Sequence, residues 1–463
     1  MSSPLIWIII PLFIAVILWF LQRNRKLVLA AASTFCGFLI LLTRILPLNS
    51  VISIGPVSFE ISTLFQFLGR RFSLDEADMP FLGLVYGIGL VWFLGALVVH
   101  VHRSFIPLAL AVIALLVAAR AVEPFLYAAL LIEMAVLISV PMFTPPGARP
   151  GLGVVRFLTF ETLGMPFILL AGWAANAVDA NPADQLLLVR AAAMLGLGFA
   201  FWLAVFPFYT WMPLLASETN PYTVGFMFCL LPTVVLLFLA DFLNAYTWLR
   251  NFSTFTQGIR LVGVLMIATG GFWAVFQTNL SRLFSYAIIV ESGYSLIALS
   301  IGTRESFEIF LSLFLARIVA IATWTLSANF FEQYRQPTFE NIRGLIMSLP
   351  WLAAGFLSSF FSLAGLPLLA GFPQRFELLE QLAQRSIGST IWVVLGTAGI
   401  MTGGVRILSS VVVPGQNETG FQESWIQRIF LLGGLVALLI LGLFPQLAST
   451  FLLPLAGAFS RLY

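Results

Sequence analysis

The stretch Ser362-Leu-Ala-Gly-Leu-Pro-Leu-Leu-Ala-Gly-Phe-Pro-Gln-Arg-Phe376 decides the fold of this chain. It lies in an apolar segment long enough to cross a bilayer, yet Gly365, Pro367 and Gly371 are residues that a continuous helix disfavours. A helix break inside the membrane frees backbone N–H and C=O groups, which are tolerated only where protein or a water-filled cavity lines them. Arg375 follows directly, and ionisable residues in membrane spans usually face a polar interior. We therefore expect a discontinuous helix beside a functional site.

The composition excludes a soluble protein. Hydrophobic residues make up 60% of the 463 residues and charged residues 9%, and the mean hydropathy is +1.01. Apolar runs of about 20 residues recur along the chain, without a polar block large enough for a soluble domain. We predict an all-α integral membrane protein with about fourteen transmembrane helices. The net charge of +3 is a small excess spread over loops and does not suggest nucleic acid as a partner.

Few residues could hold a cofactor or a metal. The chain has no Cys-x-x-Cys pair and no phosphate-binding Gly-Lys-Ser/Thr loop, and Cys36 and Cys229 lie far apart in apolar spans. His100 and His102 could form a metal pair, but a loop histidine beside Arg103 is normally solvated. We therefore expect neither a cofactor nor a metal.

The N-terminal segment, residues 1–105, is expected to hold three spans. The first, about residues 5–20, has no basic residue before it and no small-residue cleavage site, so we interpret it as a retained helix. Arg23, Arg25 and Lys26 follow it, and the positive-inside rule places their loop in the cytoplasm and both termini outside. Apolar and polar residues alternate around 51–61, which predicts a short extracytoplasmic hairpin.

The rest of the chain repeats itself. Five spans in 106–243 are followed by five in 258–413, and a C-terminal helix is expected in 424–463. Charged and helix-breaking residues keep similar offsets between the two sets: 158 for Glu133 and Glu291 (291 − 133), 156 for Glu161 and Arg317 (317 − 161), and 160 for Pro207 and Pro367 (367 − 207). Because five is odd, the pattern predicts two inverted repeats with discontinuous seventh and twelfth helices, an architecture of many secondary transporters.

Five ionisable residues in the expected spans are candidates for a proton pathway: Glu133, Glu161, Glu291, Arg317 and Arg375. Glu133 has no basic residue within one turn of its own helix, so it either binds a proton or pairs with another helix. A fixed salt bridge is the structural alternative, and it applies equally to Glu161. For Glu291, Arg317 on the next helix is the expected partner.

The basic residues limit the chemistry. Guanidinium groups do not release protons in proteins, whereas a buried lysine can. The chain has one lysine, Lys26, in the first loop. Proton movement would therefore use carboxylates and ordered water, with the arginines as fixed countercharges.

Four motifs spread over nearly the whole chain point to a known family. They are Phe206-Pro-Phe-Tyr-Thr-Trp-Met-Pro213, then Gly270-Gly-Phe-Trp-Ala-Val-Phe-Gln-Thr-Asn-Leu-Ser-Arg-Leu-Phe-Ser-Tyr286 with Val290-Glu-Ser-Gly-Tyr294, then Ala364-Gly-Leu-Pro367 with Gly371-Phe-Pro-Gln-Arg-Phe376, and finally Gly442-Leu-Phe-Pro-Gln446. In this order they resemble the Phe-Pro-Phe-His-Thr-Trp-Leu-Pro segment, the Gln-Thr-Asp-x-Lys-Arg-x-x-Ala-Tyr-Ser motif, the twelfth-helix break and the last-helix ending of the antiporter-like subunits of respiratory complex I. The same fold occurs in Mrp-type cation/proton antiporters and membrane-bound hydrogenases.

The resemblance implies roles for individual residues. Glu133 falls on the family's fifth-helix glutamate, Arg375 on its twelfth-helix lysine and Arg317 on its eleventh-helix lysine. Glu291 corresponds to the tenth-helix histidine, and the seventh-helix lysine, the proton-accepting partner of the glutamate, appears as Trp202. The resemblance thus implies a proton-pumping module, and the departures indicate one that is altered or silent.

Three functions are open at this point. The first is a non-redox membrane-arm subunit of a complex I-related (NADH:quinone oxidoreductase or Mrp-like) assembly, taking part in proton translocation coupled to redox or cation transport. Its partners would be other membrane subunits, including further antiporter-like ones, in a bacterial cytoplasmic (inner) membrane, and redox cofactors would sit on those other subunits. The second is a structural spacer that has lost pumping, and the third is a stand-alone secondary transporter. The length is typical of the shorter, inner-type subunits without a long lateral helix, and both H⁺ and Na⁺ remain possible as the transported ion.

Overall fold

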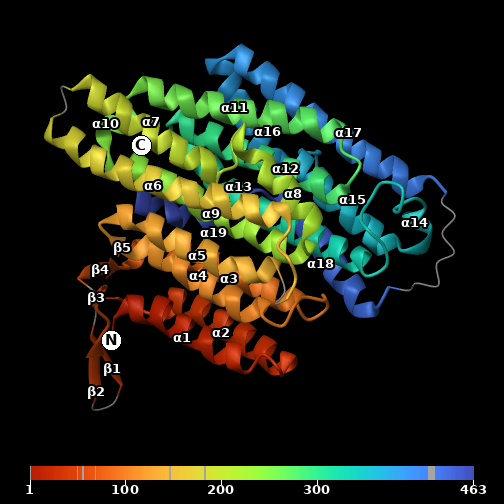
Figure 1. Cartoon of the computed structure of the whole chain (residues 1–463), viewed down its shortest axis with the longest axis horizontal. Helices are drawn as coiled ribbons and strands as arrows, with labels where there is room; N and C mark the ends of the chain where they lie inside the picture. Colours follow the sequence, from red (N-terminus) through yellow and green to blue (C-terminus); the bar gives the residue numbers. More distant parts are fainter. Residues whose placement is uncertain are drawn as a thin grey trace. The chain divides into compact units, whose positions relative to one another are not determined.

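A computed structural model describes residues 2–48, 51–54, 57–67, 69–144, 147–181, 184–414 and 423–462 (Figure 1). The chain divides into two compact units. The first unit comprises Met1–Leu97, Val101–Arg149 and Leu158–Phe199, and the second comprises Val98–His100, Pro150–Phe157 and Ala200–Tyr463.

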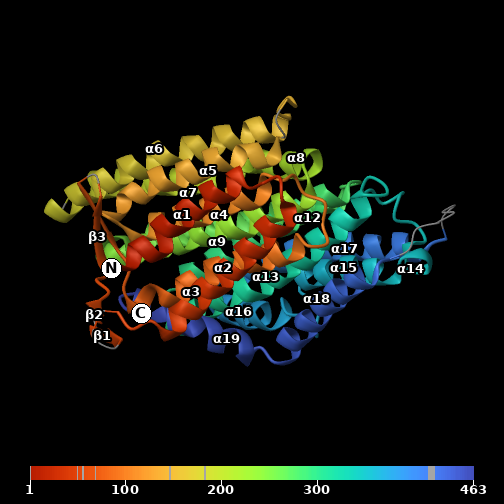
Figure 2. The ribbon, with the colours of Figure 1, turned by 90° about the horizontal axis from the view of Figure 1, so that it is seen from below.

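The first unit is mostly helical. Its helical elements are η1 (Leu5–Ile9), α1 (Ile10–Phe20), α2 (Arg25–Ile45), η2 (Glu76–Asp78), α3 (Met79–Gly95), α4 (Phe105–Ala121), η3 (Phe125–Tyr127), α5 (Ala128–Phe143), α6 (Leu152–Ala180) and α7 (Gln185–Trp202). Helix α6 begins, and α7 ends, with residues assigned to the second unit. In the first unit α1 packs on α4, α2 on α3, and α4 on α5, and these helices run side by side in Figures 1 and 2.

Short strands join α2 to α3. The hairpin expected around residues 51–61 is present as β1 (Val51–Ile54) and β2 (Val57–Glu60), which pair antiparallel. A second small sheet, which the sequence did not lead us to expect, has the order β3 (Leu64–Phe67), β4 (Arg70–Ser73) and β5 (Val122–Glu123). The long elements of the chain are therefore all helices, as expected for an all-α protein, and the strands are short additions.

The second unit holds the remaining helices. They are η4 (Phe208–Thr210), α8 (Trp211–Glu218), α9 (Pro221–Ala245), α10 (Thr247–Asn251), α11 (Ser253–Val275), α12 (Leu280–Ile301), α13 (Arg304–Glu332), α14 (Leu345–Ser348), α15 (Pro350–Ala364), α16 (Phe372–Arg385), α17 (Ile387–Val412), α18 (Trp425–Leu443), α19 (Gln446–Leu452) and η5 (Leu453–Phe459). The segment 424–463, expected to be one helix, thus contains α18, α19 and η5 in its described part.

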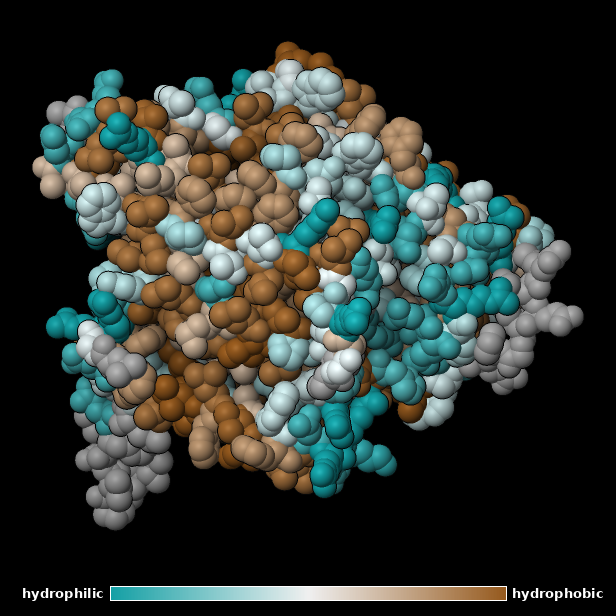
Figure 3. Space-filling view, in the orientation of Figure 1, coloured by the Kyte–Doolittle hydropathy of each residue, from teal (hydrophilic) through white to brown (hydrophobic). Residues whose placement is uncertain are grey.

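The chain is an integral membrane protein by the length and composition of its helices. Among the described residues, 11 helices are long and apolar enough to cross a membrane. The first, fourth and twelfth of the expected spans coincide instead with the shorter apolar helices Leu5–Phe20, Phe105–Ala121 and Pro350–Ala364. Figure 3 shows hydrophobic side chains covering much of the face over α6 and α7, with hydrophilic side chains gathered toward the helix ends.

Two of the expected spans are each made of two helices. Helix α7 ends at Trp202 and α8 begins at Trp211, so that Pro207 lies between them. Helix α15 ends at Ala364 and α16 begins at Phe372, so that Gly365, Pro367 and Gly371 lie in the gap.

Side-chain caps define the ends of α12 and α13. The Asn279 side chain accepts hydrogen bonds from the backbone N–H groups of the first turn of α12. Gly302, with φ of 68°, ends α12 in a left-handed conformation, and Thr303 caps α13 one residue later. These caps place Glu291 and Arg317 in the middle of two adjacent helices that pack on each other.

Glycines allow α11 to approach α17 closely. A Cβ atom at Gly271 would lie 1.9 Å from the Gly396 carbonyl oxygen, a distance that only glycine permits. Small residues at helix interfaces let backbones pack in this way in membranes, where packing rather than water exclusion holds helices together.

Gly271→Ala should lower the melting temperature of the purified protein, because overpacking a tight interface costs about 1–3 kcal/mol. Gly258→Ala is the matched control on the same helix, since no atom lies within 4 Å of its Cβ position. The measurement is thermal unfolding in detergent, and equal melting temperatures for the two variants would contradict the close crossing.

Candidate functional site

The second helix break brings Arg375 into the interior of the second unit. Gly365 has φ of 80°, which an L side chain rarely adopts, and its N–H donates to the Ser362 carbonyl oxygen at 3.1 Å. The Gly371 N–H donates to Ser362 Oγ at 3.2 Å, and a Cβ at Gly371 would lie 2.1 Å from the Ser362 carbonyl oxygen. Two glycines thus fold the chain tightly back on α15, and α16 then starts with Arg375 in its first turn.

Three charged side chains meet beside this break. Glu291, Arg317 and Arg375 are 3%, 1% and 3% exposed. Arg375 Nη2 donates to Glu291 Oε1, and Arg317 Nη2 lies 3.9 Å from Glu291 Oε2. Arg317 Nη2 also donates to the Glu291 carbonyl oxygen at 3.0 Å and to Ser295 Oγ. One carboxylate from α12 therefore contacts guanidinium groups from α13 and α16.

An aromatic ring supports Arg375. The guanidinium carbon of Arg375 lies 4.8 Å from the centre of the Tyr294 ring, within the range of a cation–π interaction. The Tyr294 hydroxyl is 2.6 Å from Thr397 Oγ1 on α17 and forms a hydrogen bond with it. Tyr294 is thereby fixed, and it restricts the position of Arg375.

The cluster carries excess positive charge. Among the described residues, neither arginine forms an ion pair with another acid, so two guanidinium groups share one carboxylate. Nε and Nη1 of both arginines and Oε2 of Glu291 are buried, and no described protein group forms a hydrogen bond with them. Buried polar groups without a hydrogen-bond partner in the protein are commonly hydrogen-bonded to ordered water.

The first unit holds a different group, made of carboxyl side chains. Glu133 on α5 is 8% exposed, and its Oε1 accepts a hydrogen bond from Thr162 Oγ1 on α6 at 2.7 Å. Glu161, next to Thr162, is fully buried and interacts electrostatically with Glu133. Glu133 Oε2 has no hydrogen-bond partner in the described part of the chain. The unit thus places two buried carboxyl groups near each other, with a neutral hydroxyl as donor.

An aromatic side chain ends α7 at the first helix break. Trp202 is 1% exposed, and its ring centre lies 6.2 Å from that of Phe238 on α9. Ala204 follows with φ of 53°, and Leu368 in the second break has φ of 75°; these are the non-glycine residues with positive φ in the described chain. Strained backbone of this kind tends to occur at functional sites.

The structure places the five candidate residues in two groups. Glu133 lies with Glu161 in the first unit, and Glu291 lies with Arg317 and Arg375 in the second. The expected neighbour relation of Glu291 and Arg317 is present, at the 3.9 Å separation given above. Four residues that support the site were not predicted from the sequence. They are Thr162, Tyr294, Ser295 and Thr397. Thr162 could have been found from its position beside Glu161, and Tyr294 and Ser295 from their place about one turn after Glu291.

His102 lies in the loop before α4. The His102 ring contacts Ser104, with Nδ1 2.6 Å from Ser104 Oγ. Within the described ranges, no group of three or more His, Cys, Asp or Glu side chains could hold a metal ion.

A family comparison covers part of the chain. Residues 180–402 match the family described as NADH:quinone oxidoreductase/Mrp antiporter, TM. One relative, NADH-quinone oxidoreductase subunit N of Methylobacterium nodulans, is 30% identical over 223 residues, which span 46% of this chain and less than half, 44%, of the relative.

Solved structures share the fold over the entire length. The Mrp complex from Dietzia sp. contains a chain with a TM-score of 0.81 and 15% identity, with 99% of both chains covered. A chain of respiratory complex I from Thermus thermophilus has a TM-score of 0.75 and 23% identity, again with 99% of both covered. The fold is therefore that of an antiporter-like membrane subunit. The match to the NADH:quinone oxidoreductase/Mrp antiporter family covers residues 180–402, just under half of the chain.

Glu291→Gln should destabilise the protein strongly, because it leaves two buried guanidinium groups without their countercharge, a change that typically costs about 3–5 kcal/mol. Glu308→Gln is the matched control on the adjacent helix α13. Glu308 pairs with Arg304 at the surface, so its loss should cost less than about 1 kcal/mol. Thermal unfolding of both variants checks this difference, and a Glu291→Gln variant as stable as Glu308→Gln would show that Glu291 does not compensate the arginines.

Proposed function

We propose that this chain is one membrane subunit of a multi-subunit assembly related to complex I or to Mrp antiporters, and that it takes part in proton translocation. The family of residues 180–402 and the fold support the assembly, because relatives with this fold are named as parts of such complexes. The observation that carries the proton role is the buried Glu133–Glu161 pair. Redox cofactors would reside on other subunits.

The carboxyl pair suits a proton relay. Two negative charges in a site of low dielectric repel each other, so the pair holds one proton and one charge more favourably than two charges. Thr162 fixes one oxygen of Glu133, and the other oxygen, Oε2, makes no hydrogen bond to a described group. That oxygen is the atom we assign to proton exchange.

The Glu291–Arg317–Arg375 cluster has a different role in this proposal. Arginine keeps its proton in proteins, so this cluster supplies a fixed positive potential instead of exchanging protons itself. We infer that it holds the charge that the family's lysines provide, without their ability to become neutral. Trp202 lies at the position of the family's seventh-helix lysine. Its indole likewise cannot exchange a proton there.

We also infer that fourteen crossings in two inverted five-helix repeats, 106–243 and 258–413, organise the chain. Each expected span falls on an apolar helix, and each expected break contains one non-glycine residue with positive φ. With Arg23, Arg25 and Lys26 in the cytoplasm of a bacterial cell, both termini lie outside the inner membrane.

A structural spacer is the second candidate, and two observations favour it. A buried indole occupies position 202, where the resemblance places an amine, and both arginines of the second unit are fixed charges. A spacer keeps the helix breaks and the fold because neighbouring subunits need its surface, while no proton passes through it.

Glu133→Gln in the reconstituted complex should lower the rate of proton translocation about tenfold or more, since a positioned acid–base group contributes at least that much to proton transfer. Glu76→Gln, an exposed carboxyl of the same unit, is the matched control and should pump at the wild-type rate. The measurement is the pH change inside proteoliposomes, with assembly checked by native gel electrophoresis.

Wild-type pumping by an assembled Glu133→Gln complex would contradict the relay and favour the spacer. Ion transport by the purified chain alone would instead remove the assembly and favour a stand-alone transporter.

A further inference from the structure

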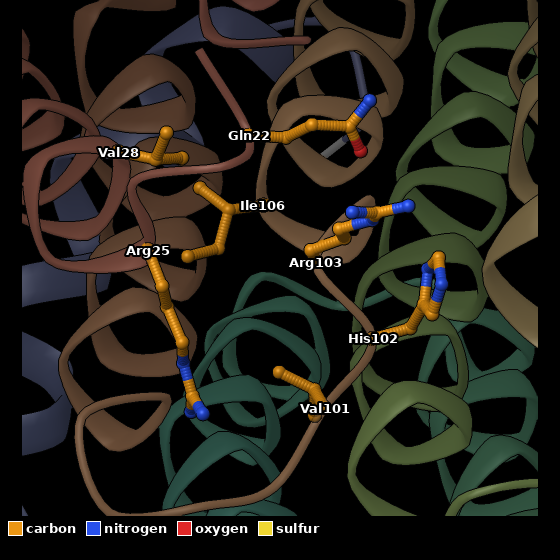
Figure 4. A pocket seen from close by; sticks show the side chains of 7 residues that line it. All are labelled: Gln22, Arg25, Val28, Val101, His102, Arg103 and Ile106. Atoms are coloured by element: carbon orange, nitrogen blue, oxygen red, sulfur yellow. The ribbon is translucent and has the colours of Figure 1, made fainter.

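A small basic cleft, about 10 Å³ in volume, lies in the first unit and shares no residue with the buried carboxyl group of that unit. It is lined by the residues labelled in Figure 4, which come from the turn after α1, the first turn of α2, the loop before α4 and the first turn of α4. Val28 and Ile106 are buried and form its apolar floor, and Gln22, Arg25, His102 and Arg103 form its polar rim.

The charge of the cleft is not compensated by neighbouring acids in sequence. Segments 21–28 and 96–106 contain Arg23, Arg25, Lys26 and Arg103 but no aspartate or glutamate. Helices α2 and α4 both begin here, and the N-terminal end of a helix carries partial positive charge. The fields of these groups therefore add, and together they favour an anion.

Three side chains present hydrogen-bond donors on one side. In Figure 4 the polar ends of Gln22, Arg103 and His102 point to the same side of the cleft, while Arg25 extends away from them. Arg25 Nη2 donates to the Ala96 carbonyl oxygen at 2.8 Å, so it supplies charge and fixes the loop. Arg103 is exposed, and no described group pairs with its guanidinium, which offers the forked geometry that suits phosphate.

The histidine tautomer adds a donor. The Ser104 backbone N–H donates to His102 Nδ1 at 3.3 Å, and the Ser104 hydroxyl, 2.6 Å from the same nitrogen, can donate to it as well, which favours Nδ1 as the acceptor. In the neutral ring the hydrogen is then on Nε2, which is a donor. Gln22, Arg103 and His102 thus offer an amide, a guanidinium and an imidazole N–H to one ligand.

The surroundings identify the ligand as a lipid. The cleft lies at the ends of apolar helices, where the phosphate groups of a bilayer are found. Next to it on α1 and α2, Phe20 is 79% and Leu27 is 46% exposed, which provides an apolar surface for acyl chains. Arg23 and Lys26 would repel the cationic headgroup of a zwitterionic lipid, so the charge favours an anionic one.

We propose that Gln22, His102 and Arg103 at the rim of this cleft bind the phosphate of an anionic phospholipid, with Arg25 adding positive charge. The bound lipid would hold the α1–α2 turn against the start of α4 at the membrane surface. This inference requires only that the chain lies in a membrane, so it stands or falls separately from the proton role.

Native mass spectrometry of the full-length protein, purified from vesicles containing equal amounts of phosphatidylglycerol and phosphatidylcholine, tests the site. Wild-type protein should retain phosphatidylglycerol in preference to phosphatidylcholine. Arg103→Gln should reduce this retention about fivefold, the effect expected for one basic residue at an anionic membrane surface. Arg149→Gln removes an exposed arginine of the same unit outside the cleft and should retain the lipid as the wild type does.

Equal retention by Arg103→Gln and wild type, or equal retention of the two lipids, would overturn the proposal. Inorganic phosphate added at tens of millimolar should not displace the lipid, and displacement would identify a free-phosphate site instead. Should Arg103→Gln fail to fold, the wild-type melting temperature decides: phosphatidylglycerol must raise it more than phosphatidylcholine does, and equal effects would refute the site.

Discussion

The ion pair between Glu291 and Arg375 depends on a backbone that leaves its helix inside the membrane. Burying a charge costs several kcal/mol unless a partner and hydrogen bonds compensate for it. Here the partner is reached only because α15 stops at Ala364 and the chain turns back before α16. A Cβ at Gly365 would lie 3.0 Å from Arg375 Nη1, so the glycine provides both the turn and the space for the guanidinium. The break and the charge therefore require each other.

The buried carboxyl groups of the two units have different hydrogen-bond and charge partners. In the second, Glu291 is in contact with two permanent cations, which compensate its charge and fix its position. In the first, Glu133 receives a hydrogen bond from a neutral hydroxyl and has a second carboxyl group nearby. A hydroxyl can also accept a hydrogen bond, so this environment tolerates either protonation state of Glu133. Of the two sites, the one around Glu133 can gain or lose a proton without leaving a buried cation unpaired. We therefore propose the proton role for Glu133 and not for Glu291.

The sequence predicted features that depend on local residue type and failed where packing between helices decides. Glycine and proline within an apolar run indicated the gaps that contain Pro207 and Pro367, because these residues disfavour helix wherever they occur. Helix order indicated that Glu291 could meet Arg317. The closer contact with Arg375 could not be predicted, since it depends on the direction in which α16 leaves the break. The hydrogen bond from Thr162 to Glu133 depends likewise on the rotation of α6 against α5, and the sheet of β3, β4 and β5 on a pairing between distant segments.

The contacts that maintain the fold of this chain are largely different from the residues proposed to exchange protons. Close glycine crossings, helix caps and aromatic packing also hold the fold together, and none of these contacts needs an ionisable base. Trp202 shows this directly, because its buried indole packs near Phe238 at the end of α7 and fills space without any charge. A TM-score of 0.81 to a solved chain at 15% identity therefore reports a shared fold and not a shared set of bases. Since function lies in the site and not in the fold, the proton role proposed here depends on the carboxyl groups of α5 and α6 and not on the likeness of the fold.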